Sequence, residues 1–401
     1  MSKLRVVWLC HFVNDQLNQR YCTNKQERAP WMDLFFNLMS ECPAIDIHVI
    51  APNLCSNKDD KFIENGITFH LYRYYPGLLP SKWANLYLAL TLGIGYRNKI
   101  KFIVKKIKPD LIHLFGSENL DYSSGVLPLV DEYPILVSIQ GEISNAKIKG
   151  NIVSRIFMQS QIHNEKKINN KLRYFTLIDD ENWKQSFKHK YPAAKIFDMY
   201  FPTKIPSCMD VHVEKKYDFV FYGRVSYFKG IEDLIAAIAI VKKDKKDVSL
   251  LVIGRINSLY KAQLNQLIKK NELEDNITFI GFLKSQEDVF RHALQAQIYV
   301  LPTHFDGLPG TVRECMYLKI PVITYPVGAL PVFNKKRTSL LFAKYKEISD
   351  LATQMLFLLN NKLYREKLVR NAYITVTEEF SNDNITSILP NIYTDVLKCG
   401  Q

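Results

Sequence analysis

The chain has 401 residues, of which 47% are hydrophobic and 12% aromatic, so it can bury sizeable cores and is not a disordered protein. Its length suits two domains of about 150–200 residues each. The 53 lysines and arginines exceed the 40 aspartates and glutamates, and the net charge of +13 favours phosphates, anionic lipids or nucleic acid as partners without choosing among them.

The N-terminus and the cysteines bear on the compartment. Residues 1–12 carry too short an apolar stretch for a signal peptide and are predicted to enter a strand almost at once. The seven cysteines include no Cys-x-x-Cys pair, and their odd number argues against a disulfide framework or a zinc site. A reducing cytoplasm is therefore the expected environment.

Short β-branched or aromatic runs alternate with amphipathic stretches through the first half of the chain. This alternation of strand and helix predicts a mostly parallel sheet that is covered on both faces. We expect helices at 30–40 and 82–106. The expected strands are 4–10, 45–51, 67–73, 110–115, 135–140 and 173–178.

The segment 83–108 joins an apolar stretch to a basic one. No part of the chain has 18 uninterrupted apolar residues, so no membrane span is predicted. Residues 97–108 hold six cations and no acid, and such a helix can lie on an anionic membrane surface. An ordinary covering helix with a solvated basic end explains the pattern equally well.

Residues 201–216 have two prolines, mixed polarity and no period, which predicts a linker between a first domain at 1–200 and a second at 217–380. A C-terminal helix at 381–401 is expected to pack back on the first domain. After the linker the alternation restarts, which predicts a second Rossmann-like parallel sheet facing the first across a central cleft. Its expected strands are 217–223, 248–254, 276–281, 297–302 and 321–326, with helices at 229–243, 258–271 and 285–295 and a helical tail from 347 to 397.

In such sheets ligands bind beyond the carboxyl ends of the strands, so the residues that follow strands are the candidates for function. The strand at 217–223 ends in Gly223, which allows close approach of a ligand, and Arg224 and Lys229 follow before a helix. A planar guanidinium, a lysine charge and a helix N-terminus together suit a diphosphate. When these residues are considered alone, a solvated basic loop would account for them equally.

Two acids follow the strand at 297–302. Asp306 precedes a turn rich in glycine and proline, a helix is expected to begin near Pro309 or Gly310, and Glu314 comes one turn later. A carboxylate accepts two hydroxyl hydrogen bonds, as a ribose or hexose offers. The structural alternative is that Asp306 caps the helix and Glu314 is a surface acid.

The acid pair, the sequence "PVITYPVGALPVF" and the Gly-Arg-x4-Lys-Gly motif about 80 residues earlier together resemble the retaining glycosyltransferases of family 4, which have the GT-B fold. The likeness covers nearly all of the second domain. It implies that Arg224 and Lys229 bind and stabilise the departing diphosphate, that Glu314 accepts the ribose hydroxyls and that Asp306 contacts the donor sugar. The family usually has Glu where this chain has Asp306.

The resemblance also implies a set of donor-binding residues, with the base stacked near 281–283. These residues are Gly223, Gly281, Phe282, Leu283, Gly307, Leu308, Pro309, Gly310 and Thr311. The first domain is similar to acceptor-binding domains of bacterial members that act on surface polysaccharides. Glu118, Gln140 and Gly141 end strands there and are candidates to face the donor sugar or the acceptor, although strand-end packing explains them nearly as well. Many members have His where this chain has Gln140.

The sequence therefore predicts an enzyme that transfers a sugar from a nucleotide diphosphate sugar, a UDP- or GDP-sugar, to a saccharide or lipid-linked saccharide in cell-surface polysaccharide biosynthesis. It would act in the cytoplasm or peripherally on the inner face of the membrane. No metal, no cofactor beyond the donor co-substrate and no nucleic-acid partner are expected. A non-catalytic nucleotide-sugar-binding module is the alternative. The absence of dinucleotide-binding, P-loop and Gly-x-Ser-x-Gly motifs argues against dehydrogenases, P-loop enzymes and such hydrolases.

Overall fold

The computed structural model describes residues 3–25, 28–145, 151–207 and 213–400. The chain divides into two units, one made of Met1–Pro202 and Asn382–Gln401 and the other of Thr203–Ser381. Part of the linker predicted at 201–216, including Cys208, lies outside the described residues; the described parts, 201–207 and 213–216, carry no helix or strand. Each unit is an α/β unit built on a parallel sheet, as the sequence predicts.

Among the described residues, the first unit has an eight-stranded sheet of order β3-β4-β2-β1-β5-β6-β7-β8, in which only β3 runs antiparallel to its neighbour. The central strand β1 has fully buried residues from Val6 to Leu9, which places the core on both faces of the sheet. The strands are β1 (Leu4–Leu9), β2 (Ile45–Asn53), β3 (Asp60–Glu64), β4 (Ile67–Arg73), β5 (Leu111–Phe115), β6 (Ile135–Ser138), β7 (Tyr174–Leu177) and β8 (Lys195–Asp198).

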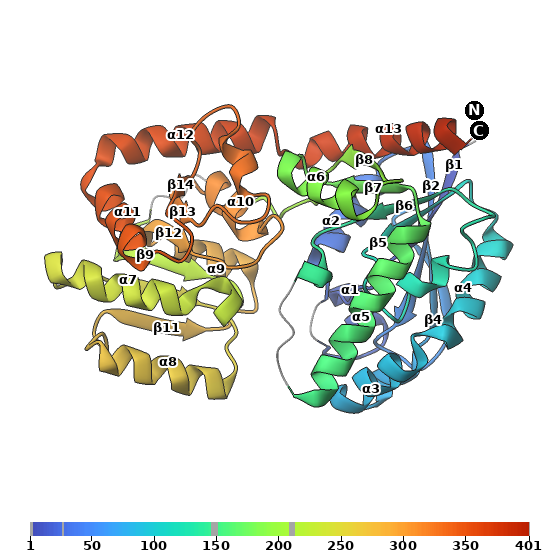
Figure 1. Cartoon of the computed structure of the whole chain (residues 1–401), viewed down its shortest axis with the longest axis horizontal. Coiled ribbons are helices and arrows are strands. Elements are labelled where there is room, and N and C mark those ends of the chain that lie inside the picture. The colour runs from blue at the N-terminus through green and yellow to red at the C-terminus, as the bar shows by residue number, and fades with distance from the viewer. Residues whose placement is uncertain (1–2, 26–27, 146–150, 208–212, 401) are drawn as a thin grey trace. The chain divides into compact units, whose positions relative to one another are not determined.

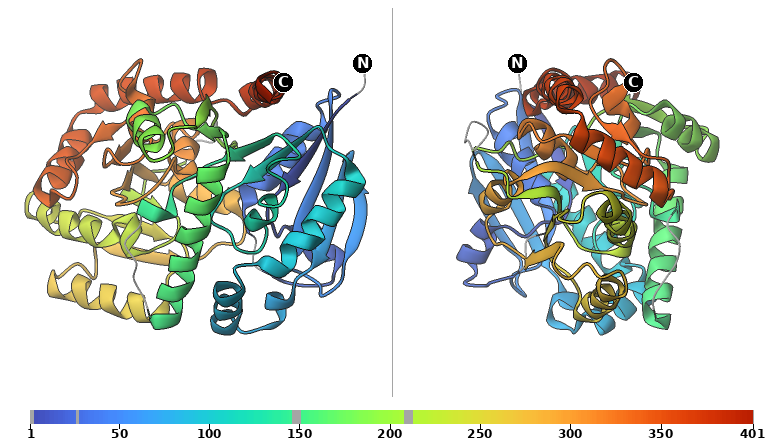
Figure 2. Two further views of the ribbon diagram at one scale, coloured as in Figure 1. Left: turned by 45° about the vertical axis from the view of Figure 1, so that its right-hand side comes forward. Right: turned by 90° about the vertical axis from the view of Figure 1, so that its left-hand side faces the viewer.

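Helices cover this sheet, and α13, which follows the whole second unit in sequence, belongs to the first unit and packs against α2 (Figure 1). The cyan helix α4 runs along the blue strands of the sheet in Figure 2, and α3 packs against α5. The helices are α1 (Asp15–Arg20), α2 (Pro30–Ser40), α3 (Ser81–Thr91), α4 (Ile94–Ile107), α5 (Ile152–Lys171), α6 (Glu181–Lys190) and α13 (Asn382–Gly400).

The prediction of a single helix at 82–106 is wrong, because the chain forms two helices, α3 and α4, there. They are separated at Leu92 and Gly93, both of which have left-handed backbones with φ of 48° and 64°. A Cβ atom on Gly93 would lie 1.6 Å from the carbonyl oxygen of Leu120, so only glycine permits this approach. A tertiary contact therefore interrupts a pattern that reads as one helix locally.

Among the described residues, the second unit has a six-stranded parallel sheet of order β11-β10-β9-β12-β13-β14. The strands are β9 (Tyr217–Tyr222), β10 (Leu250–Ile253), β11 (Ile277–Gly281), β12 (Ala296–Leu301), β13 (Val322–Thr324) and β14 (Leu341–Phe342). The helices are α7 (Ile231–Asp244), α8 (Ser258–Lys270), α9 (Gln286–Ala293), α10 (Gly310–Tyr317), α11 (Ile348–Asn360) and α12 (Lys362–Glu378).

A buried polar cluster ties α13 to the central strands of the first unit. The hydroxyl of Tyr393 accepts a hydrogen bond from Nε1 of Trp8 at 2.9 Å and lies 2.7 Å from Nδ1 of His113. The other ring nitrogen of His113 lies 2.7 Å from Oγ of Ser138. This residue is thus a satisfied core histidine, and burial lowers its pKa to about 3.

Tyr393→Phe should destabilise the first unit by about 1–3 kcal/mol, because it leaves the buried Trp8 and His113 nitrogens without their partner. Urea denaturation followed by tryptophan fluorescence measures the loss. The control is Tyr87→Phe, which alters an exposed tyrosine on α3 and should change stability by less than about 0.5 kcal/mol. Equal stabilities for the two variants would contradict the role given to Tyr393.

Candidate functional site

The second unit reverses its strand order at β9. Strands β10 and β11 extend the sheet on one side of β9, and β12, β13 and β14 extend it on the other. In a parallel sheet this reversal opens a crevice beyond the carboxyl ends of the two strands that flank it. The loops that follow β9 and β12 carry Arg224, Lys229 and Asp306, so the sequence-predicted residues meet at this point.

The two loops are bound directly to each other. Nζ of Lys229 forms an ion pair with Oδ2 of Asp306. The backbone nitrogen of His304 donates to the carbonyl of Phe228 at 2.8 Å, and a Cβ on Gly230, whose φ is +73°, would lie 1.8 Å from the carbonyl oxygen of Pro302. Close backbone packing therefore fixes a cation and an acid from separate loops against one another.

A second Gly-Arg pair lies beside the predicted one. Arg224 is exposed and, among the described residues, its guanidinium has no hydrogen-bond or ion-pair partner. Arg255 follows β10 as Arg224 follows β9, and its guanidinium lies 3.9 Å from the ring centre of Phe282, which is 52% exposed. The region predicted to stack the base, 281–283, thus ends β11 and carries an exposed ring with a cation on its face.

The structural alternative for the two acids is wrong. Helix α10 begins at Gly310 after Pro309, and no side chain caps its N-terminus, so Asp306 is not a helix cap. Glu314 is 6% exposed and is therefore not a surface acid. The loop between them is held in place because Gly307 accepts a 3.0 Å hydrogen bond from the backbone nitrogen of Ala329.

The carboxylate of Glu314 lies in a buried polar setting. Nε2 of Gln286 donates to its Oε1 at 2.6 Å. Burial raises the pKa of Glu314 to about 7, and the nearby charge of Arg313 and the hydrogen bond from Gln286 oppose the rise. Both the protonated and the ionised carboxyl keep a free lone pair, so either form can accept a ligand hydroxyl.

Further side chains that the sequence analysis did not single out support this site. The hydroxyls of Tyr222 and Tyr299 donate to the backbone oxygen and Oγ1 of Thr311 at 3.0 and 2.9 Å, which anchors the first turn of α10. Nε2 of His304 lies 2.9 Å from Oδ2 of Asp233. None of these side chains stands out in the sequence. Arg255, described above, does have a signal, since "VIGR" repeats the Gly-Arg strand end of "FYGR".

The first unit also brings its predicted residues together. Its strand order reverses between β1 and β5, and a cavity of about 170 Å³ there is lined by Gly116, Glu118, Gln140 and Gly141, with His11 from the loop after β1. Burial raises the pKa of Glu118 to about 7. The carboxyl and amide groups of this cavity suit sugar hydroxyls.

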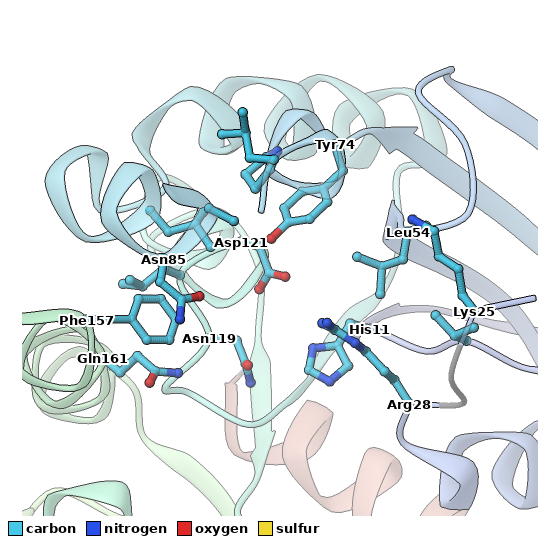
Figure 3. Close-up of a pocket in the computed structure, with 16 residues that line it drawn as sticks. His11, Lys25, Arg28, Leu54, Tyr74, Asn85, Asn119, Asp121, Phe157 and Gln161 are labelled. Atoms are coloured by element: carbon cyan, nitrogen blue, oxygen red, sulfur yellow. The ribbon is translucent and has the colours of Figure 1, made fainter. Parts of the chain in front are cut away.

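A larger pocket of about 500 Å³ lies next to this cavity, and His11 and Asn119 line both (Figure 3). Its wall also includes Lys25, Arg28 and Asp121, none of which the sequence analysis singled out. Lys25 and Arg28 lie between α1 and α2, and Asp121 follows β5, so no local pattern joins the three residues.

No metal site is evident in the described part of the chain, where no group of three or more His, Cys, Asp or Glu side chains could hold an ion. Across the described ranges, every helix is also too short or too polar to cross a membrane.

Residues 210–375 match the family model of glycosyl transferases group 1. A relative is the capsular polysaccharide biosynthesis glycosyltransferase CapM of Staphylococcus aureus, 26% identical over 188 residues that make up 44% of this chain and 46% of that protein. The chain thus spans about half the length of the curated relatives that it matches.

Two solved structures share the fold. Sucrose-phosphate synthase from Thermosynechococcus elongatus is 16% identical, with a TM-score of 0.74 over 99% of this chain and 100% of that chain. HepE of Anabaena in complex with UDP and glucose is 12% identical, with a TM-score of 0.64 over 98% and 99%. The fold is GT-B, and the matches agree on the superfamily of GT-B glycosyltransferases.

The raised pKa of Glu314 predicts a pH-dependent stability difference. Its proton is held more tightly in the folded chain than in the unfolded one, so the resulting stabilisation is present at low pH and is lost as pH rises from about 4.5 through 7. Glu314→Gln keeps a neutral partner for Gln286 and has no such proton to lose.

Chemical denaturation at pH 5 and pH 8 tests this difference. Relative to Glu314→Gln, the wild type should lose on the order of 1–3 kcal/mol between the two pH values. Parallel stability curves for the two proteins would show that Glu314 is not a buried, hard-to-ionise carboxyl.

Proposed function

We propose that this chain is a retaining glycosyltransferase that moves a sugar from a nucleotide diphosphate sugar to a saccharide or lipid-linked saccharide acceptor. The observation that carries the proposal is the joining of Lys229 and Asp306 at the strand-order reversal. Arg224 lies in the same connection as Lys229, between β9 and α7, and its guanidinium has no partner among the described residues. All three residues lie within the segment that matches glycosyl transferases group 1. The matched segment also includes Glu314.

The cations would act on the leaving group. Breaking the anomeric C–O bond places negative charge on the departing diphosphate, and fixed cations stabilise that charge as it develops. Arg224 offers a planar fork of donors and Lys229 a point charge. Asp306 orients Lys229 before the donor arrives and can exchange that contact for a donor sugar hydroxyl. No bound metal ion is required in this proposal.

Retention would follow from attack on the face that the diphosphate leaves. The acceptor oxygen bonds to the anomeric carbon, the bond to the diphosphate breaks, and the acceptor proton passes to a departing phosphate oxygen. Asp306 would not act as a nucleophile on this route, because its carboxylate pairs with Lys229 before the donor binds and accepts a sugar hydroxyl afterwards. Glu314 would hold the ribose hydroxyls, with the base stacked on Phe282.

The donor and the acceptor class rest partly on the relatives. HepE of Anabaena has been solved with UDP and glucose, which supports a UDP- or GDP-sugar as donor here. CapM is a capsular polysaccharide biosynthesis glycosyltransferase, which supports an acceptor on the route to a cell-surface polysaccharide. The hydroxyl-binding cavity at Glu118 and Gln140 would receive the reactive end of that acceptor.

A peripheral membrane position at the cytoplasmic face would suit a lipid-linked acceptor. Trp83 and Leu90 on α3 and Phe102 on α4 are 58%, 74% and 60% exposed. The exposed lysines Lys105 and Lys106 follow on α4. Large apolar side chains beside clustered lysines are typical of surfaces that bind anionic lipid.

Arg224→Ala should abolish the thermal stabilisation that the true donor gives in a screen of UDP- and GDP-sugars. The guanidinium is exposed and unpaired in the described structure, so its removal should leave the fold intact. Transfer by this variant should fall by about 10²–10³-fold in kcat.

Arg370→Ala is the matched control, because Arg370 is another exposed arginine of the second unit. Equal donor stabilisation in both variants would rule out the assigned diphosphate site. Stabilisation of the wild type by a donor, without transfer to any acceptor, would favour the non-catalytic binding module.

Lys105→Glu combined with Lys106→Glu should weaken binding to phosphatidylglycerol vesicles by more than about tenfold, since each basic residue near the surface contributes about 1 kcal/mol. Vesicle cosedimentation measures this. Lys362→Glu with Lys367→Glu on α12 makes the same charge change on exposed lysines of the second unit and should have little effect. The membrane position is wrong if all three proteins bind alike.

A further inference from the structure

The large pocket of the first unit has an uneven distribution of charge. Lys25, Arg28 and His11 approach it from one side, and the carboxyl group of Asp121 and the hydroxyl of Tyr74 lie together beyond them (Figure 3). Asn85, Gln161 and Phe157 line the side away from Lys25. A ligand that fills this pocket would therefore meet cations at one end and neutral hydrogen-bonding groups at the other.

Arg28 is the distinctive cation of this pocket. Two other arginines of the first unit are neutralised, Arg5 by Asp46 and Arg20 by Asp60, each at 2.9 Å. The side chain of Arg28, by contrast, has no hydrogen bond or ion pair with any residue that the structure describes. Its backbone is nevertheless fixed, because its nitrogen donates to the carbonyl oxygen of Val13 at 3.0 Å and its carbonyl oxygen accepts from the nitrogen of Val13 at 3.1 Å.

Lys25 adds to the positive charge at this wall. Its Nζ donates to the carbonyl oxygen of Leu54, which holds the ammonium at the pocket and leaves two of its three protons for a ligand. His11 is different, because burial lowers its pKa against the opposing charge of Asp121, and Arg28 adds to the lowering. It is neutral at physiological pH and can donate one hydrogen bond without adding charge.

The opposite groups suit uncharged hydroxyls. Burial raises the pKa of Asp121, although the nearby His11 and Arg28 oppose the rise, and the hydroxyl of Tyr72 donates to its backbone oxygen at 2.7 Å, which fixes the loop. Asn85 and Gln161 add amide donors and acceptors beside the ring of Phe157. An apolar ring with carboxyl and amide groups around it is the usual setting for a pyranose, whose faces are apolar and whose rim carries hydroxyls.

We propose that this pocket binds an acceptor saccharide that carries an oxyanion, a phosphoryl or a carboxyl group, with the oxyanion held by Arg28 and Lys25. The proposal rests on the glycosyltransferase function and specifies its acceptor. His11 and Asn119 line both this pocket and the cavity of Glu118 and Gln140. The acceptor would thus extend from its charged group at Arg28 to its reactive hydroxyl in that cavity.

The position of α3 bears on the source of the oxyanion. Ala84, Asn85 and Leu88 of α3 line the pocket, whereas Trp83, Tyr87 and Leu90 on another face of the same helix are exposed. One helix therefore separates the anion pocket from an exposed apolar surface. This arrangement fits the phosphoryl group of a lipid-linked acceptor, and an acidic sugar would present the same chemistry through a carboxylate.

The test compares three probes on the full chain: glucose 1-phosphate, glucuronic acid and glucose. Ligand-detected NMR titrations would give their dissociation constants in the presence of excess UDP, which occupies the proposed donor site. We expect both anions to bind about tenfold more tightly than glucose, and Arg28→Gln to remove that advantage while leaving glucose unchanged. Tighter binding of glucose 1-phosphate would point to a phosphoryl acceptor, and tighter binding of glucuronic acid to an acidic sugar.

Two controls locate the effect. Lys171→Gln removes an exposed positive charge at the end of α5 in the same unit, and Arg370→Ala removes an exposed positive charge from the other unit. Neither should change binding of the anions. The proposal is overturned if neither anion binds, if glucose binds as tightly as they do, or if Arg28→Gln behaves as wild type.

A different result would refute the glycosyltransferase function and leave the oxyanion site intact. If anion binding depended on Arg28 but no nucleotide sugar bound or was consumed, the oxyanion site would stand and the transferase would not.

Discussion

The ion pair between Lys229 and Asp306 is the interaction on which the account of the second unit depends. It joins two loops that leave neighbouring strands at the point where the strand order reverses, and the packing of Gly230 against Pro302 leaves those loops little freedom. A cation held in place before a ligand binds needs no reorganisation when charge develops on that ligand. In the proposed reaction, the pair would also keep the acid occupied until a sugar hydroxyl replaces the lysine.

The first unit uses the same architecture for a different chemistry. Its strand order also reverses beside its first strand, between β1 and β5. The loops there line the cavity and the large pocket, which adjoin and share His11 and Asn119. The cavity has a carboxyl and an amide group suited to hydroxyls, and the large pocket has the cations Arg28 and Lys25. Parallel sheets thus explain why both sets of polar residues gather at carboxyl strand ends.

Much of the fold could be predicted because buried parallel strands are short apolar runs between amphipathic helices. The strand expected at 4–10 is β1 (Leu4–Leu9), and the helix expected at 30–40 is α2. Strand β3 was missed because it is an exposed, polar, antiparallel edge, and the break between α3 and α4 depends on a distant contact with Leu120. The site residues of the second unit could be predicted because they lie in short motifs directly after two strands. The residues that line the large pocket of the first unit, Arg28 among them, come from several elements and share no spacing.

A crystal structure of the chain with bound uridine diphosphate tests the central claim most directly, because it locates the diphosphate without reference to turnover. The account predicts that the phosphate oxygens contact Arg224 and Lys229 beyond the ends of β9 and β12, that the ribose hydroxyls contact Glu314, and that the base lies on Phe282. A nucleotide bound elsewhere, with Lys229 still paired to Asp306 and Arg224 in solvent, would contradict it.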